Sequence, residues 1–268
     1  MSTPAEAYAR SQADRAHPHL AAFRDRYVFA LDDFQVQACR EVEAGHGVLV
    51  AAPTGSGKTI VGEFAVHLAL ATQRKCFYTT PIKALSNQKF NDLVEMHGAD
   101  QVGLLTGDNT INGEAPIVVM TTEVLRNMLY AGSRTLDRLG YVVMDEVHYL
   151  ADRIRGAVWE EVIIHLPESV SVISLSATVS NAEEFGEWLT AVRGDTVTIV
   201  EERRPVPLHQ HVLVGRKMFP LFEGDDQGTQ VNRQLERIAR EDWQFSRMHK
   251  GRPGKGGSRP RSRHRAPS

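Results

Sequence analysis

Residues 48–70 read VLVAAPTGSGKTIVGEFAVHLAL. An apolar run typical of a buried strand leads into a short loop with two glycines, and an amphipathic helical pattern follows. The segment Ala52–Thr59 fits the phosphate-loop pattern, with Ala at the first position where the strict pattern has Gly. A strand, a glycine loop and a helix in this order predict a nucleotide-binding α/β domain. The alternative is a plain glycine-rich turn.

The residue types of this loop suit a bound triphosphate. Gly55 and Gly57 let backbone amides turn toward phosphate oxygens because no Cβ is in the way. Lys58 is expected to reach the β- and γ-phosphates, and the Thr59 hydroxyl to bind Mg²⁺. The predicted cofactors are therefore ATP and Mg²⁺. The residues of the loop expected to bind the nucleotide are Thr54, Gly55, Ser56, Gly57, Lys58 and Thr59.

A second motif supplies carboxylates. Residues 141–148 read YVVMDEVH, which places an acidic pair directly after a buried strand. Asp145 is expected to hold Mg²⁺, directly or through water, and Glu146 to orient and deprotonate the water that attacks the γ-phosphate. A pair that merely caps the next turn is the alternative. Together with the loop, the acidic pair predicts nucleotide hydrolysis. The two motifs do not indicate which process the energy of hydrolysis drives.

Short apolar runs alternate with helical patterns through the middle of the chain. Runs that are apolar on both faces and alternate with helices indicate a parallel sheet covered on both sides. We therefore predict an α/β fold, a doubly wound and mainly parallel sheet of about seven strands. The predicted strands are 47–52, 75–80, 101–106, 117–122, 141–146, 172–178 and 196–201, and the predicted helices are 57–71, 83–96, 123–130, 157–166 and 182–192.

The composition is ordinary for a soluble globular protein, with 42% apolar and 24% charged residues. No apolar run is long enough to cross a bilayer and the N-terminus lacks a secretory signal, so a cytoplasmic protein without a membrane partner is expected. Cys39 and Cys76 stand far apart, which favours two buried thiols over a disulfide or a metal site.

The chain is predicted to contain four segments. These are a flexible N-terminal segment 1–26, the α/β domain 27–203, a connector 204–244 with one more strand and one helix, and a basic disordered linker 245–268. The linker has eight Lys or Arg and no acid, which leaves 23 basic against 33 acidic residues elsewhere. Because the chain outside the linker is acidic, any polyanion that it binds must be held mainly by backbone amides and helix N-termini. The linker either adds nonspecific affinity for that polyanion or is a solvated spacer.

Several further motifs occur in a fixed order with the loop and the acidic pair. They read TTPIKALSNQKF (79–90), GLLTGD (103–108), VMTTEVLRNML (119–129), MDEVHYLADRIRGAVWEEVIIHLP (144–167) and SLSATVSNAEEFGEWL (174–189). Together they resemble the DExH-box branch of superfamily 2 helicases. The likeness is closest to the superkiller-type RNA helicases that work with RNA-degrading exosomes, and above all to the bacterial HelY-type members. The resemblance covers about residues 29–213 and implies a RecA-like domain of an ATP-dependent helicase.

The resemblance also implies roles around the nucleotide. Phe29 would stack on the adenine ring, and Gln35 would read its edge. His148 would link the nucleotide site to the neighbouring motifs. Ser176 and Thr178 would relay the nucleotide state. A core phenylalanine, a structural histidine and ordinary strand-end hydroxyls are the alternative roles.

The remaining motifs imply a surface for one nucleic-acid strand, expected to be RNA. Contacts would go to the sugar-phosphate chain, with little readout of the bases. Each of these residues has a helix cap as its alternative role. The expected contact residues are Pro81, Lys83, Gln88, Thr106, Gly107, Thr122, Glu123 and Arg126.

Helicases of this type use two RecA-like domains, and the second supplies arginine fingers to the ATP site. Neither a second sheet pattern nor the family's QxxGRxGR motif occurs in these 268 residues. The sequence therefore predicts the first motor domain of a longer helicase, weakly active or inactive by itself. Its expected partners are the second RecA-like domain and an RNA-degrading nuclease. The alternatives are a DNA helicase of the repair type and an ATP-gated clamp that does not unwind.

Overall fold

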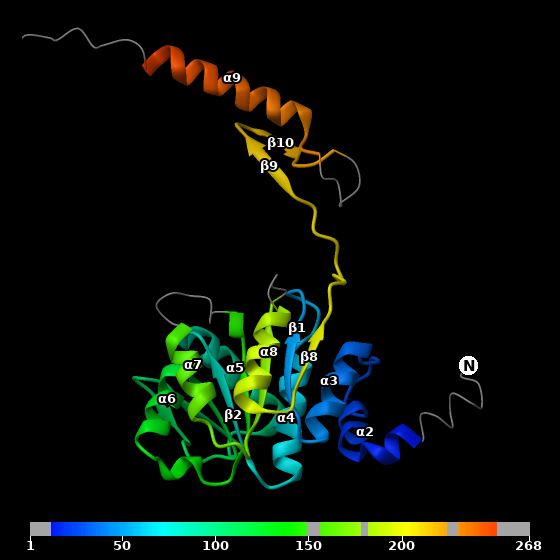
Figure 1. The fold of residues 1–268 in the computed structure, drawn as a ribbon, viewed down its shortest axis with the longest axis vertical. Helices are drawn as coiled ribbons and strands as arrows, with labels where there is room; N and C mark the ends of the chain where they lie inside the picture. The colour runs from blue at the N-terminus through cyan, green and yellow to red at the C-terminus, as the bar shows by residue number, and fades with distance from the viewer. Residues whose placement is uncertain (1–11, 149–155, 178–181, 224–229, 251–268) are drawn as a thin grey trace, which may run out of the picture. The chain divides into compact units, whose positions relative to one another are not determined.

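The structure is a computed structural model that describes residues 12–148, 156–177, 182–223 and 230–250, with side chains described as far as residue 241. The chain divides into two compact units, Met1–Pro205 and Val206–Ser268. The first unit holds the large sheet, and the second holds a hairpin and a helix (Figure 1).

The first unit is built on an eight-stranded sheet with the order β4-β3-β5-β2-β6-β7-β1-β8. All neighbouring strands are parallel except the pair β3 and β4. The strands are β1 Gly47–Ala51, β2 Lys75–Thr80, β3 Val102–Leu105, β4 Thr110–Ile111, β5 Ile117–Thr121, β6 Leu139–Met144, β7 Ser171–Ser176 and β8 Thr196–Val200. The predicted doubly wound α/β fold is confirmed. The extra strand, β4, has two residues and is too short to show a periodic pattern.

Helices cover both faces of this sheet (Figure 1). One face packs against α3 Asp33–Glu43, α4 Thr59–Ala71 and α5 Lys83–His97, and α2 Pro18–Arg24 packs against α3 and α4. The other packs against α6 Thr122–Tyr130, α7 Gly156–His165 and α8 Ala182–Arg193, and a short 3₁₀ helix spans Arg134–Leu136. All five predicted helices are present, with ends within two residues of the predicted ones.

The strand sequences follow from this two-sided burial. In β1, Val48 and Val50 join the core beneath α3 and α4, whereas Leu49 joins the core on the opposite face. A strand buried on both faces needs apolar side chains at every position, which produces the unbroken apolar runs seen in the sequence. Cys39 and Cys76, predicted to be buried thiols, are both buried.

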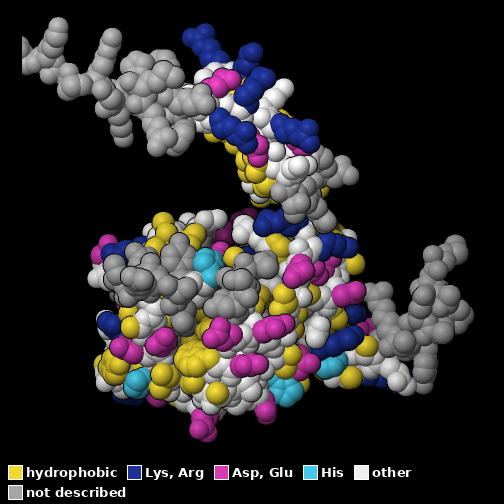
Figure 2. Space-filling model, turned by 45° about the horizontal axis from the view of Figure 1, so that its top comes forward, with side chains coloured by type: hydrophobic (Ala, Val, Ile, Leu, Met, Phe, Trp, Pro, Cys, Tyr) yellow, Lys and Arg dark blue, Asp and Glu magenta, His cyan; other side chains and the backbone are white. Residues whose placement is uncertain are grey.

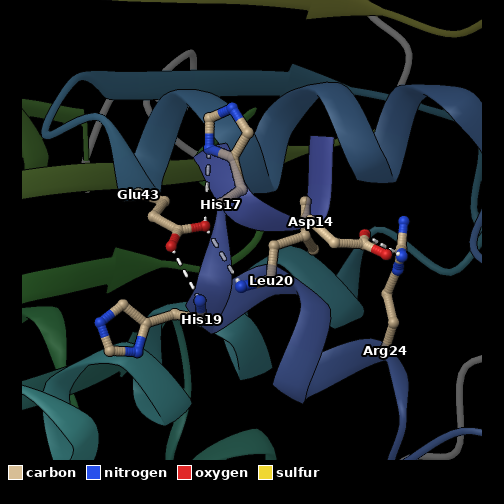
Figure 3. A network of polar contacts seen from close by, with 6 residues as sticks. All are labelled: Asp14, His17, His19, Leu20, Arg24 and Glu43. Carbon is tan, nitrogen blue, oxygen red and sulfur yellow. Dashed lines mark hydrogen bonds and ion pairs between the residues drawn. The ribbon is translucent and has the colours of Figure 1, made fainter. Parts of the chain in front are cut away.

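The structure differs from the sequence prediction near the N-terminus. Helix α2 lies within the segment predicted to be flexible, yet its Leu20 and Phe23 are buried. The Glu43 carboxylate at the end of α3 accepts hydrogen bonds from the backbone N–H groups of His19 (2.9 Å) and Leu20 (3.2 Å) (Figure 3). The helix is therefore capped by a residue more than twenty positions away, which local sequence reasoning does not detect.

The second unit contains a hairpin and a helix. The strands β9 His211–Val214 and β10 Lys217–Pro220 pair antiparallel, and α9 spans Arg233–Lys250. One strand and one helix were predicted here, so β10 is an addition, and the first six residues of the predicted linker are helical. Figure 2 shows Lys and Arg side chains gathered on this unit. Among the described helices of the chain, none is long and apolar enough to cross a membrane.

Candidate nucleotide and nucleic-acid site

The loops after β1, β2, β6 and β7 meet at one edge of the sheet. Parallel strands end at the same edge, and these four strands are neighbours in the order β2-β6-β7-β1. The backbone N–H of Ala52 donates to Ser176 O (3.1 Å), and that of Asp145 donates to Thr79 O (3.0 Å). The phosphate loop, the acidic pair and the serine segment thus lie side by side, where ligands bind in open α/β sheets.

The phosphate loop depends on its glycines for its shape. Gly55 has φ +86° and Gly57 has φ +81°, a region that residues with a Cβ rarely adopt. A Cβ on Gly57 would also lie 2.6 Å from Nε2 of Gln35, so space is restricted as well as conformation. A side chain at Gly57 would displace Gln35 from the loop.

Lys58, the residue before α4, is a buried cation. Its exposed fraction is 6%, and among the residues that the structure describes no carboxylate lies within ion-pair distance of its ammonium group. The hydroxyls of Ser56 and Ser176 are also buried and have no hydrogen-bond partner there. Burying polar groups without partners costs free energy, and an anion in the loop would satisfy these groups. The loop therefore fits a phosphate group.

A cavity of about 160 Å³ opens beside this loop. It is lined by Asp32, Asp33, Phe34, Ser56, Glu201, Arg203 and Pro205. The Gln35 amide Nε2 donates to the carbonyls of Ser56 (3.3 Å) and Gly57 (3.0 Å), so this side chain supports the loop. Phe29 is about half exposed, and its ring centroid lies 5.2 Å from that of Tyr27. The adenine contacts of Gln35 and Phe29 stay predictions.

The acidic pair has a defined geometry. Asp145 is half-buried, and its Oδ1 accepts a hydrogen bond from the backbone N–H of Glu146 (3.0 Å). Its Oδ2 accepts one from the hydroxyl of Tyr78 (3.1 Å). Glu146 has φ +56°, a conformation that costs a non-glycine residue of the order of 1–3 kcal/mol and that clusters at functional sites.

His148 lies between the acidic pair and the segment after β7. Its Nδ1 is 3.3 Å from Glu146 Oε2 and 3.5 Å from the backbone N–H of Ala177, which donates to it. Ser176 pairs in register with Ala51, the last residue of β1. This arrangement suits the predicted coupling role of His148 and Ser176, which stays a prediction. Thr178 lies outside the described residues.

The donors present fit Mg²⁺. Among the described residues, no group of three or more His, Cys, Asp or Glu side chains is placed to hold a metal ion. Mg²⁺ is usually held by one or two carboxylates together with substrate phosphates, so it does not need such a group. Asp145 is half-buried with both oxygens fixed by protein donors, and Thr59 is the first residue of α4 after the loop. These two residues would hold the ion.

The other half of the same edge carries the predicted nucleic-acid motifs. Strands β3, β5 and β2 are neighbours, so the segments after them lie together. Lys83 Nζ pairs with Asp108 Oδ1 at 2.9 Å, which joins the segment after β2 to the segment after β3. Helices α5 and α6 begin here, and within these described helices neither first turn has a side-chain cap. Their unpaired amides suit phosphate groups.

The predicted contact residues differ in exposure. Pro81 and Thr122 are buried, so they would reach a bound strand only through their backbone. Lys83, Gln88 and Gly107 are exposed, while Thr106, Glu123 and Arg126 are half-buried. The exposed pair between Lys83 and Asp108 contributes little stability, and its lysine can turn to a phosphate at small cost.

A family model described as DEAD/DEAH box helicase matches residues 32–185. The chain belongs to this family. It is 64% identical over 249 residues to "Probable helicase HelY" of Mycobacterium tuberculosis (strain CDC 1551 / Oshkosh), covering 88% of this chain and 27% of that protein. It is 48% identical over 215 residues to "DExH-box ATP-dependent RNA helicase DExH15 chloroplastic" of Arabidopsis thaliana, covering 78% of this chain and 18% of that protein. The predicted HelY-type resemblance is confirmed, and the chain spans about a quarter or less of these relatives.

A solved structure shows the same fold. The DUF1998 helicase MrfA bound to DNA and AMPPNP matches with a TM-score of 0.56 and 23% identity, covering 70% of this chain and 29% of that one. The RecA-like helicase fold predicted from the resemblance is confirmed.

Sequence reasoning missed one residue of this site. Tyr78 lies in the apolar run 75–80, which reads as an ordinary buried strand, yet its hydroxyl contacts Asp145. The available signal was a tyrosine within an otherwise buried strand, because a buried tyrosine hydroxyl usually has a hydrogen-bond partner.

Proposed function

We propose that this chain is the ATP-binding motor domain of a superfamily 2 RNA helicase, in which ATP hydrolysis drives the remodelling of RNA. The observation that carries the proposal is the buried cation of Lys58. It lies without an acidic partner among the described residues, beside a loop whose glycines adopt positive φ, at the sheet edge that also holds Asp145. A triphosphate with its metal would satisfy these groups together.

Each residue of the site would have its own task. The loop amides and Lys58 bind the β- and γ-phosphates, while Asp145 and the Thr59 hydroxyl hold Mg²⁺. The ion, when bound, neutralises charge on the phosphate oxygens. Glu146 orients a water molecule and accepts its proton. His148 contacts both Glu146 and the segment after β7, so a change at the nucleotide can reach that segment.

The RNA assignment and the partners are the finer part of the proposal. They are supported by the helicase-like motifs between residues 79 and 189 and by the relative of A. thaliana that is named an RNA helicase. In the longer protein, the second RecA-like domain would complete the ATP site, and an RNA-degrading nuclease would consume the strand. The unpaired amides of α5 and α6 would hold the strand's phosphates.

The nucleotide site is tested by replacing Lys58 with methionine. We expect the affinity for a fluorescent, non-hydrolysable ATP analogue to fall roughly 10- to 100-fold, since a hydrogen bond to a charged group contributes about 1.5–3 kcal/mol. Lys75→Met is the matched control. Lys75, the first residue of β2, is also largely buried, but its ammonium group pairs with the carboxylate of Glu114. An unchanged affinity in Lys58→Met would place the nucleotide elsewhere.

The choice of RNA is tested in the full-length protein with RNA and DNA strands of one sequence. We expect half-maximal stimulation of ATP hydrolysis at a roughly tenfold lower concentration of RNA than of DNA. The reason is that each hydrogen bond to a 2′-hydroxyl contributes about 0.5–1.5 kcal/mol. Equal or stronger stimulation by DNA would overturn the RNA assignment. Strand binding without any stimulation would favour an ATP-gated clamp.

A further inference from the structure

Tyr78 is a fully buried tyrosine whose hydroxyl meets the acidic pair. It donates to Asp145 Oδ2 at 3.1 Å, while Asp145 Oδ1 accepts from the backbone N–H of Glu146 at 3.0 Å. Each oxygen of this carboxylate therefore has a protein donor. A carboxylate with both oxygens fixed has a single orientation at the sheet edge.

The tyrosine ring is itself held firmly by neighbouring helices. A Cβ on Gly62 would lie 3.1 Å from Cε2 of Tyr78, so α4 packs directly against the ring at its glycine. From α5, Lys89 Nζ lies 5.3 Å from the ring centroid, a cation–π distance. Lys89 also pairs with Glu63 Oε1 of α4 at 3.7 Å. The hydroxyl therefore has little freedom to leave Asp145.

The direction of the hydrogen bond follows from the chemistry of the two groups. The phenol of Tyr78 carries the proton and donates it, and the Asp145 carboxylate can only accept. A donor to a metal-binding carboxylate orients that ligand, and loss of such a partner typically lowers metal affinity or activity about 10- to 100-fold.

We propose that Tyr78 is a positioning residue for the magnesium site, whose hydroxyl holds the Asp145 carboxylate in the orientation that meets the ion. Because its ring lies against α4, the same side chain joins the acidic pair to the helix after the phosphate loop. The inference rests on the proposed function, since it needs Asp145 to hold Mg²⁺. The alternative is that Tyr78 has only a structural role in the core, and that its hydrogen bond to Asp145 satisfies the buried hydroxyl without affecting the metal site.

The test is Tyr78→Phe, which removes the hydroxyl and keeps the ring against Gly62. A fluorescent, non-hydrolysable ATP analogue is titrated onto this chain over a range of Mg²⁺ concentrations. We expect the affinity without Mg²⁺ to stay within about twofold, and the Mg²⁺ concentration at half-effect to rise about tenfold. Tyr141→Phe is the matched control, because it removes the same atom from a buried tyrosine of the neighbouring strand β6, whose ring lies beside Arg74. It should leave the Mg²⁺ midpoint unchanged.

Asp145→Asn separates this inference from the proposed function. If Asp145→Asn leaves the Mg²⁺ midpoint unchanged, the magnesium assignment fails and the inference with it. If only Asp145→Asn raises the midpoint, the proposed function stands and the positioning role of Tyr78 is overturned. An equal loss of affinity with and without Mg²⁺ in Tyr78→Phe would also overturn it. In the double variant, Tyr78→Phe should add almost nothing to Asp145→Asn, because the tyrosine acts through that carboxylate.

Discussion

Joined to a second RecA-like domain, this chain is expected to hydrolyse ATP about 10³–10⁵ times faster than it does alone, which is the contribution measured for an arginine finger. The chain itself supplies a phosphate loop, Lys58 and an acidic pair at one sheet edge. The helicase resemblance implies that arginines from the second domain complete the site. Without them, the charge that develops on the transferred phosphoryl group is only partly neutralised.

The measurement compares ATP turnover by this chain and by a two-domain protein, in which it is joined to a second RecA-like domain from a HelY-type relative. Turnover in the two-domain protein should disappear with Lys58→Met, which shows that the activity belongs to this site. Robust, strand-stimulated turnover by the chain alone would contradict the expectation. It would mean that the first domain carries a complete hydrolytic site.

The sheet could be predicted because burial on both faces requires apolar residues along most of each central strand. Strands β1 and β6 are covered on both faces, so their sequences are unbroken apolar runs. The phosphate loop could be predicted because its backbone needs positive φ at Gly55 and Gly57. In both cases the physical requirement is local and fixes the residue type.

The features that were missed depend on partners far along the chain. Helix α2 is capped by Glu43, and the backbone of the phosphate loop is held by Gln35. Tyr78 contacts Asp145 across 67 positions of sequence. None of these residues differs in type from an ordinary core or surface residue. Only the fold brings the two partners together, so a local pattern can indicate at most that a buried hydroxyl needs a partner, and not which residue supplies it.

The second large effect is expected from Glu146→Gln in the two-domain protein. Turnover should fall about 10²–10⁴-fold, because glutamine cannot accept the proton of the attacking water. Nucleotide affinity should stay within about twofold. Glutamine has the size of glutamate and can adopt the same backbone conformation at φ +56°. Multiple-turnover hydrolysis and a binding titration with the ATP analogue measure the two quantities separately.

A matched control and the contrary outcomes make this test decisive. Glu160→Gln makes the same change at an exposed position of α7 and should leave both quantities unchanged. Unchanged turnover in Glu146→Gln would show that another group accepts the proton. A joint loss of affinity and turnover would show that Glu146 supports the loop instead of acting on water. Loss of turnover with affinity retained separates a hydrolytic motor from a clamp that uses ATP only as a ligand, because a clamp does not need a base at this position.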